Sequence, residues 1–162
     1  MQSWMVTNFM RNKPGPFLRF LLRLPILQYK IGLGKSIGNR ILILNTRGRI
    51  TGKTRQTALG YAYDPSSKGY LVMTGWEGRS DWYRNVLAEP EVGLWVGSMK
   101  TLARVNKLTL EENVAEIKRM LTLDPFAERM LSELDNLPYD GSEDWYRTVA
   151  DHNASLRIIP TE

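Results

Sequence analysis

Residues 46–61 read Thr46-Arg47-Gly48-Arg49-Ile50-Thr51-Gly52-Lys53-Thr54-Arg55-Gln56-Thr57-Ala58-Leu59-Gly60-Tyr61. An apolar run at 41–45 precedes this stretch and predicts a buried strand, and the alternating run at its end predicts a second one. Between the two runs, cations accompany Gly48 and Gly52. Glycine can bring backbone N–H groups close to a ligand, and Arg and Lys bind phosphate or carboxylate oxygens. The loop therefore suits an anionic group.

Composition alone leaves a second interpretation open, a basic β-hairpin whose charges lie in water, because hairpin loops are commonly polar and contain glycine. The loop is not a Walker phosphate loop. That motif has four residues between its glycines and opens a helix, whereas three residues separate Gly48 from Gly52 and a strand is expected next.

Length and composition predict a single domain over residues 1–162. The chain is 43% hydrophobic and 24% charged, as in ordinary globular proteins. It has no cysteine, which excludes disulfides, thiolate metal sites and a cysteine nucleophile, and its one histidine, His152, excludes a His-rich metal site. We expect no metal. The net charge of +5 favours an anionic partner, whether nucleic acid, lipid headgroups or an anionic cofactor.

The N-terminal segment, residues 1–33, reads as an arm with an amphipathic helix. Residues 17–31 are apolar and basic without an acid, and they are too short and too charged to span a bilayer. A basic amphipathic helix permits peripheral contact with a membrane surface. The alternative is a helix that packs its apolar side on the domain. Gly32, Gly34 and Gly38 predict a loop before the first strand.

The pattern downstream predicts short antiparallel strands with helices placed late, which favours a small barrel or an α+β sheet over alternating βαβ units. We expect the barrel core at 41–106, and helices with a closing strand at 109–160. Expected strands are 41–45, 55–63, 70–74, 91–96, 101–106 and 155–159, and expected helices are 80–88, 109–123, 127–134 and 142–150. Ser80 is expected to cap its helix, Thr109-x-x-Glu112 forms a capping box, and Tyr83 and Arg84 are expected to face outward.

Three segments then carry a resemblance to a known family. They are Gly48-Arg49-x-Thr51-Gly52-Lys53-x-Arg55-x-x-Ala58-Leu59, Tyr70-Leu71-Val72-Met73-Thr74-Gly75-x-x-Gly78, and Asp81-Trp82-Tyr83-Arg84-Asn85-x-x-Ala88-x-Pro90-x-Val92. In this order and spacing the chain resembles the deazaflavin (F420)-dependent nitroreductase and quinone reductase family, well over roughly residues 30–110. The resemblance implies a mostly antiparallel split β-barrel, like that of FMN-binding proteins, with an N-terminal helix and C-terminal helices.

The resemblance also implies a cofactor site. Arg49, Lys53 and Arg55, with Thr51 in place of the usual Ser, would hold the phosphate and the start of the oligoglutamate tail of coenzyme F420. The deazaflavin ring would be lined by Ala58, Leu59, Gly60, Thr74, Gly75 and Gly78, and bordered by Trp82 and Asn85. Trp145 and Tyr146 are candidates for the acceptor side, with ordinary packing as the alternative. No residue is singled out as catalytic, because the cofactor carries the hydride.

The sequence departs from the family pattern at three positions. Ala58 and Ser80 stand where proline is common, and Ile50 stands where many members have a basic residue. The loss of a cation at Ile50 removes one contact to the tail. These differences bear on the pose of the cofactor more than on the fold.

The function that this resemblance implies is hydride transfer from reduced F420 to a small-molecule acceptor, namely a quinone, a nitro compound or an activated enone. Two alternatives stay open: an FMN-binding oxidoreductase of the same fold, and a non-enzymatic basic module that binds anionic lipid or nucleic acid. We expect no nucleic acid partner, because the cations gather in one loop instead of forming a long stripe. A homodimer is compatible with a split barrel. We expect a cytoplasmic protein, with membrane association through residues 17–31.

Overall fold

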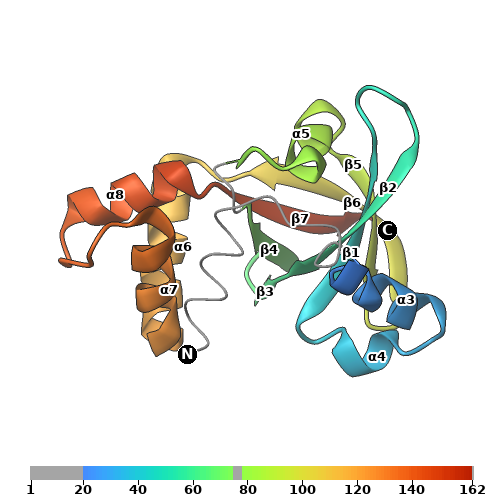
Figure 1. Cartoon of the computed structure of the whole chain (residues 1–162), viewed down its shortest axis with the longest axis horizontal. Helices are drawn as coiled ribbons and strands as arrows, with labels where there is room; N and C mark the ends of the chain where they lie inside the picture. The colour runs from blue at the N-terminus through green and yellow to red at the C-terminus, as the bar shows by residue number, and fades with distance from the viewer. Residues whose placement is uncertain (1–19, 75–77, 162) are drawn as a thin grey trace.

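The computed structural model describes residues 20–74 and 78–161, and the N-terminal arm at 1–19 and Gly75 lie outside this part. One seven-stranded sheet forms the body of the molecule (Figure 1), with the strand order β2-β1-β5-β6-β7-β4-β3. Its strands are β1 Ile41–Arg47, β2 Thr54–Gly60, β3 Ala62–Asp64, β4 Gly69–Met73, β5 Glu91–Val96, β6 Met99–Lys107 and β7 Ser155–Thr161. Each strand pair is antiparallel, as expected.

The barrel core lies on one face of β1. Leu42 and Leu44 are fully buried and pack in a cluster with residues of β4, β5 and β7. Helix α5, Asp81–Ala88, adds Trp82 and Val86 to the same cluster. Because side chains alternate along a strand, the apolar run at 41–45 supplies this core with one residue in two, and the basic loop follows where the run ends.

The strand expected at 55–63 is divided in two. Residue Tyr61 interrupts it, because its backbone N–H donates to Arg40 O at 3.3 Å and its phenol donates to Gly38 O. The segment before Tyr61 pairs with β1, whereas the segment after it pairs with β4. One continuous pattern in the sequence thus serves two different parts of the sheet.

A layer of three helices lies between β6 and β7 in the chain: α6 Leu110–Leu123, α7 Pro125–Asp135 and α8 Glu143–His152 (Figure 1). The helices bury a second cluster that includes Ile117, Leu131 and Trp145. The capping box expected at Thr109 and Glu112 is present. Asp124 also caps α7, so that helix begins two residues before the expected position.

In the described part of the chain, the short helices α3 Leu24–Lys30 and α4 Gly34–Ile37 precede the sheet. Helix α4 lies where the sequence indicated a loop, because Gly34 and Gly38 allow close approach to the β5–β6 turn. A Cβ on Gly38 would overlap the backbone of Gly97. Tyr29 anchors α3, since its phenol donates to Ile41 O at 2.7 Å and accepts from Gly97 N at 3.0 Å.

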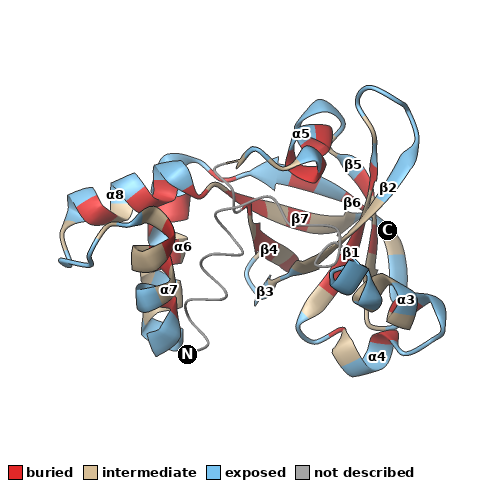
Figure 2. Ribbon diagram, in the orientation of Figure 1, coloured by how far each residue is buried: buried red, intermediate tan, exposed pale blue. Residues whose placement is uncertain are grey.

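Part of α3 nevertheless faces solvent (Figure 2). Leu27 is 55% exposed and Ile31 is 63% exposed, so the apolar side of this segment does not pack fully on the barrel. Within residues 20–74 and 78–161, no helix has the length and apolarity needed to cross a membrane.

Candidate functional site

The basic loop between β1 and β2 projects from the sheet beside α5 (Figure 1). It is ordered by its own backbone: Gly48 N donates to Lys53 O at 2.9 Å, and Gly52 N donates to Gly48 O at 2.7 Å. Gly52 has a φ of 66°, which glycine adopts without strain. Lys53 N donates to the Thr51 hydroxyl at 3.4 Å. These three N–H groups are therefore used inside the loop.

Two cations of this loop, Lys53 and Arg55, are exposed and make no ion pair with any residue between 20–74 or 78–161. Arg55 lies opposite Thr46 in the β1–β2 ladder, and Leu59 lies opposite Leu42. Paired residues of an antiparallel ladder share a face, so Arg55 lies at the loop end of the face that forms the barrel core. The charge of both cations is therefore available to an anionic ligand at the barrel rim.

Arg49 differs from these two cations because it is already bonded to α5. Its backbone N and its Nη1 both donate to Asn85 Oδ1, each at 3.1 Å, and its Nη2 forms an ion pair with Asp81 Oδ1 at 3.2 Å. Asn85 is buried, with 4% of its surface exposed. The structure thus brings together Arg49 and Asn85, two residues that the resemblance assigns to the cofactor site.

The residues implied for the deazaflavin ring lie on two faces of β2. Leu59 packs against the barrel core. Ala58 and Gly60 lie opposite Ile43 and Ile41, on the other face of the ladder. Thr74 directly follows β4 and is buried, and its backbone N donates to Ala154 O at 3.0 Å.

Three buried hydroxyls near these elements have no hydrogen-bond partner among the described residues: those of Thr46, Thr74 and Ser80. Ser80 precedes α5 at the expected cap position, but its side chain makes no cap bond, which corrects that expectation. A buried hydroxyl without a partner costs about 1–3 kcal/mol, so native proteins usually satisfy it. Unpartnered hydroxyls on β1, β4 and at the start of α5 fit a bound molecule with polar edges, and the exposed cations Lys53 and Arg55 fit its phosphate.

The aromatic residues of α5 are both buried. Trp82 is 8% exposed and Tyr83 is 7% exposed, and both belong to the barrel core. The expectation that Tyr83 faces outward is therefore wrong, whereas Arg84 is exposed as expected. The pocket for the Tyr83 ring depends on Gly78, where a Cβ would lie 2.9 Å from Tyr83 Cε1. No residue pattern within α5 reveals this contact, because Gly78 lies before the helix.

We expect Gly78→Ala to lower the free energy of unfolding by about 2–3 kcal/mol, because Ala is strained at its φ of 67° and its methyl group displaces Tyr83. Urea unfolding measures this change. Gly97→Ala is the matched control: Gly97 has a φ of 60° but nothing within 4 Å of an added Cβ, so it reports the backbone cost alone. Equal losses in the two variants would contradict the role assigned to the Tyr83 contact.

Trp145 and Tyr146 lie on α8, in the layer of three helices. Trp145 is 2% exposed, and its indole Nε1 donates to Leu137 O at 3.1 Å. Tyr146 is half-buried and shares a hydrogen bond of 2.8 Å with Tyr139. That bond, followed by burial, raises the pKa of Tyr146 to about 12. The phenol therefore stays protonated at neutral pH. Met73 at the end of β4 packs against the same cluster, which joins this layer to the barrel next to Thr74.

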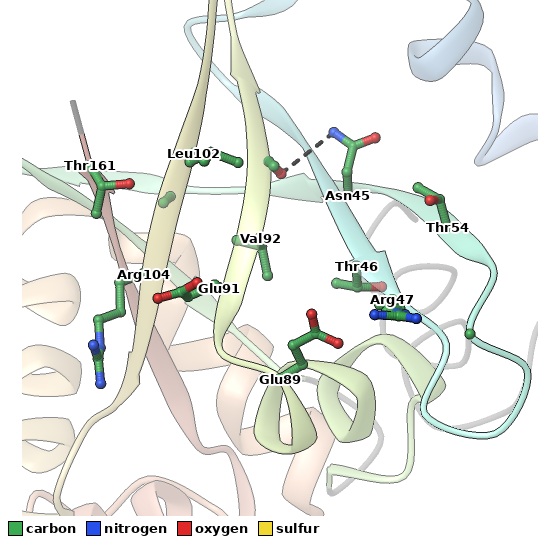
Figure 3. Close-up of a pocket in the computed structure, with 13 residues that line it drawn as sticks. Asn45, Thr46, Arg47, Thr54, Glu89, Glu91, Val92, Leu102, Arg104 and Thr161 are labelled. Atoms are coloured by element: carbon green, nitrogen blue, oxygen red, sulfur yellow. Dashed lines mark hydrogen bonds between the residues drawn. The ribbon is translucent and has the colours of Figure 1, made fainter.

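A hollow of about 790 Å³ lies beside β1, β5 and β6 (Figure 3). Charged side chains of both signs line it, including Arg47, Glu89, Glu91 and Arg104. None of the residues that the resemblance implies for the cofactor or the acceptor lines this hollow. It adjoins the candidate site, because Thr46 and Arg47 of β1, and Gly52 and Thr54 of the basic loop and β2, line it as well.

Comparison with solved structures identifies the fold. A pyridoxamine 5'-phosphate oxidase-related, FMN-binding protein from Nostoc punctiforme PCC 73102 matches with a TM-score of 0.52 and 12% identity, over 91% of this chain and 82% of that one. The heme storage protein HutZ from Vibrio cholerae matches with a TM-score of 0.51 and 15% identity, over 84% and 91%. The F420-H2 dependent reductase FDR-A matches with a TM-score of 0.49 and 22% identity, over 74% and 93%. The first two of these matches confirm the expected split-barrel fold.

No curated protein matches the chain. A family model, however, covers residues 28–127, which is more than half of the sequence. The chain belongs to the F420H(2)-dependent quinone reductase family. It is therefore an oxidoreductase, and the cofactor of its family is F420.

Proposed function

We propose that this protein reduces a quinone with hydride from reduced F420. The observation that carries the proposal is the pair of exposed cations, Lys53 and Arg55, on an ordered loop beside α5 and the unpartnered buried hydroxyls. F420H2 held there would supply a hydride and be oxidised to F420, and the quinone would take up that hydride and a proton to become a hydroquinone. Nitro compounds and activated enones are alternative acceptors, since they also accept hydride.

In this proposal Lys53 and Arg55 hold the phosphate of the cofactor, and Thr51 supports the turn that presents Lys53. The ring would lie against Leu59, Thr74 and Gly78, with Trp82 and Asn85 at its border. Ala58 and Gly60 lie on the other face of β2, and Gly75 lies outside the described residues. The hydroxyl of Thr74 is a buried group that an edge of the ring would satisfy. The surrounding apolar side chains exclude water from the site of transfer.

The acceptor side is proposed to include Tyr146, with Trp145 packed beneath it. A phenol that stays protonated can donate a hydrogen bond to the carbonyl oxygen of a quinone as negative charge develops there. The bond between Tyr146 and Tyr139 would hold the phenol in place. Trp145 would contribute by orienting Tyr146, since their rings lie 5.3 Å apart at 90°.

Titration of the purified protein with F420 and, separately, with FMN tests the cofactor, followed through tryptophan or cofactor fluorescence. We expect binding of F420 and much weaker binding of FMN. Tighter binding of FMN would keep the fold and replace the hydride donor. Binding of neither would contradict the proposal and favour a basic module for anionic lipid or nucleic acid. Single-turnover oxidation of bound F420H2 by a quinone, a nitroarene and an enone then ranks the acceptors.

We further propose peripheral contact with a membrane through α3, since its apolar residues are exposed beside Arg23 and Lys30. A Leu27→Glu/Ile31→Glu variant should lose co-sedimentation with vesicles that contain phosphatidylglycerol. Leu123→Glu is the control, because Leu123 is 69% exposed but lies on α6. Equal loss in the control, or no binding by the unmodified protein, would contradict this contact.

We also propose that the protein is a homodimer. Light scattering, which measures the molar mass in solution, tests this oligomeric state.

A further inference from the structure

The network around Arg49 assigns this residue a role that differs from that of the other loop cations. Asp81 and Asn85 are four residues apart on α5, so they present side chains on one face of the helix. Both point their acceptor oxygens at Arg49. The guanidinium therefore uses Nη1 and Nη2 within the protein, whereas Lys53 and Arg55 have no such acceptor among the described residues.

The two ends of this network differ in exposure. The Asn85 end is buried, at 4% exposed, whereas the side chain of Asp81 is 82% exposed and that of Arg49 is 27% exposed. Asn85 Oδ1 accepts from both the backbone and the side chain of Arg49, which fixes the start of the loop as well as the guanidinium. The Asp81 carboxylate then holds the outer edge of the guanidinium from the solvent side.

We propose that Arg49 is a positioning residue that fixes the loop to α5 through its bonds to Asp81 and Asn85. We call these three residues the clamp. The clamp holds the loop so that Lys53 and Arg55 face the phosphate of the cofactor, and Arg49 itself does not bind the phosphate. The effect of the clamp on cofactor binding rests on the proposed function. The clamp itself is a property of the chain without a ligand.

The direction in which Asp81→Asn changes the affinity for F420 distinguishes a clamp from direct phosphate binding by Arg49. If Arg49 binds the phosphate, Asp81 competes for its guanidinium, and Asp81→Asn will tighten the binding of F420. If Arg49 is a clamp, Asp81→Asn loosens the loop and weakens binding by about two- to fivefold, the scale of an exposed ion pair. Arg49→Ala should weaken binding further, by about tenfold or more, because it also removes a buried hydrogen bond.

The double variant Arg49→Ala/Asp81→Asn should bind F420 as Arg49→Ala does, because Asp81 acts only through Arg49. Asp144→Asn is the matched control: Asp144 lies in the first turn of α8, as Asp81 does in α5, and makes no ion pair with a described residue. Tighter binding by Asp81→Asn would overturn the clamp, and so would a loss in the control equal to that of Asp81→Asn.

Hydrogen exchange without any ligand tests the clamp independently of the cofactor. Exchange of the backbone amides of residues 49–53 should be faster in Asp81→Asn and in Arg49→Ala than in the unmodified protein and in Asp144→Asn. Unchanged exchange in both loop variants would overturn the proposal. If F420 fails to bind but exchange increases, the proposed function fails and the clamp stands, so the two failures are distinguishable.

Discussion

The Lys53→Ala/Arg55→Ala variant is expected to bind F420 about 100-fold more weakly than the unmodified protein. A hydrogen bond to a charged group contributes about 1.5–3 kcal/mol, and exposure of these two side chains favours the low end. Two such bonds amount to about 3 kcal/mol, which corresponds to a factor of about 100 in the dissociation constant. Fluorescence titration at fixed ionic strength measures the change.

The loss of two positive charges would weaken the binding of any anionic ligand, so this prediction needs a control variant with the same change in net charge. Lys107→Ala/Arg129→Ala provides it, because Lys107 ends β6 and Arg129 lies on α7, so that neither belongs to the basic loop. The control should bind F420 within about threefold of the unmodified protein, because exposed charges beyond a Debye length are screened. A comparable loss in both double variants would mean that the general field of the protein, and not the loop, holds the phosphate.

The Trp145→Ala variant is expected to lose about 3–5 kcal/mol of unfolding free energy, the usual cost of removing a large buried ring. Trp145 is 2% exposed, its indole N–H has Leu137 O as acceptor, and the ring of Tyr139 packs on it edge-on at 4.9 Å. For a chain of this length we expect Tm to fall by about 10 °C or more. Thermal unfolding and urea titration measure the two quantities.

The Tyr146→Phe variant separates a role in packing from a role in binding the acceptor. This variant keeps the ring and removes the hydroxyl that bonds to Tyr139, so Tm should fall by only a few degrees, on the scale of about 1 kcal/mol for one hydrogen bond. If Tyr146 serves the acceptor, the KM or kcat for the quinone should change while the affinity for F420 stays the same. A large loss of activity in Trp145→Ala without loss of stability would contradict the packing role of Trp145.

Much of the local structure could be predicted because it depends on neighbours in the sequence. The apolar run at 41–45 becomes β1, the turn at Gly97 and Ser98 joins β5 to β6, and the Thr109 capping box begins α6. Each of these features needs only a few consecutive residues to satisfy its backbone groups or to bury one face. The order and spacing of the glycine and cation motifs likewise sufficed to indicate the family that the comparisons confirm.

Other features follow from residues that meet only in the folded chain. Ser80 occupies a cap position but its side chain bonds no helix N–H, and Tyr83 is buried because Gly78 leaves room for its ring. Local patterns favoured a cap at Ser80 and an outward Tyr83. Both expectations were wrong because a local pattern carries no information about the residues that the fold places nearby. Tyr61 divides one predicted strand because its partners are Gly38 and Arg40, more than 20 residues earlier.

The basic loop shows the same division within a single stretch. Its composition alone establishes that it is cationic, turns at glycine and suits an anion. The folded chain decides which cation is available, because α5 places Asp81 and Asn85 against Arg49 and leaves Lys53 and Arg55 without an ion pair in the described structure. Charge is a property of the residue, whereas the acceptor that neutralises it belongs to an element 32 or more residues away.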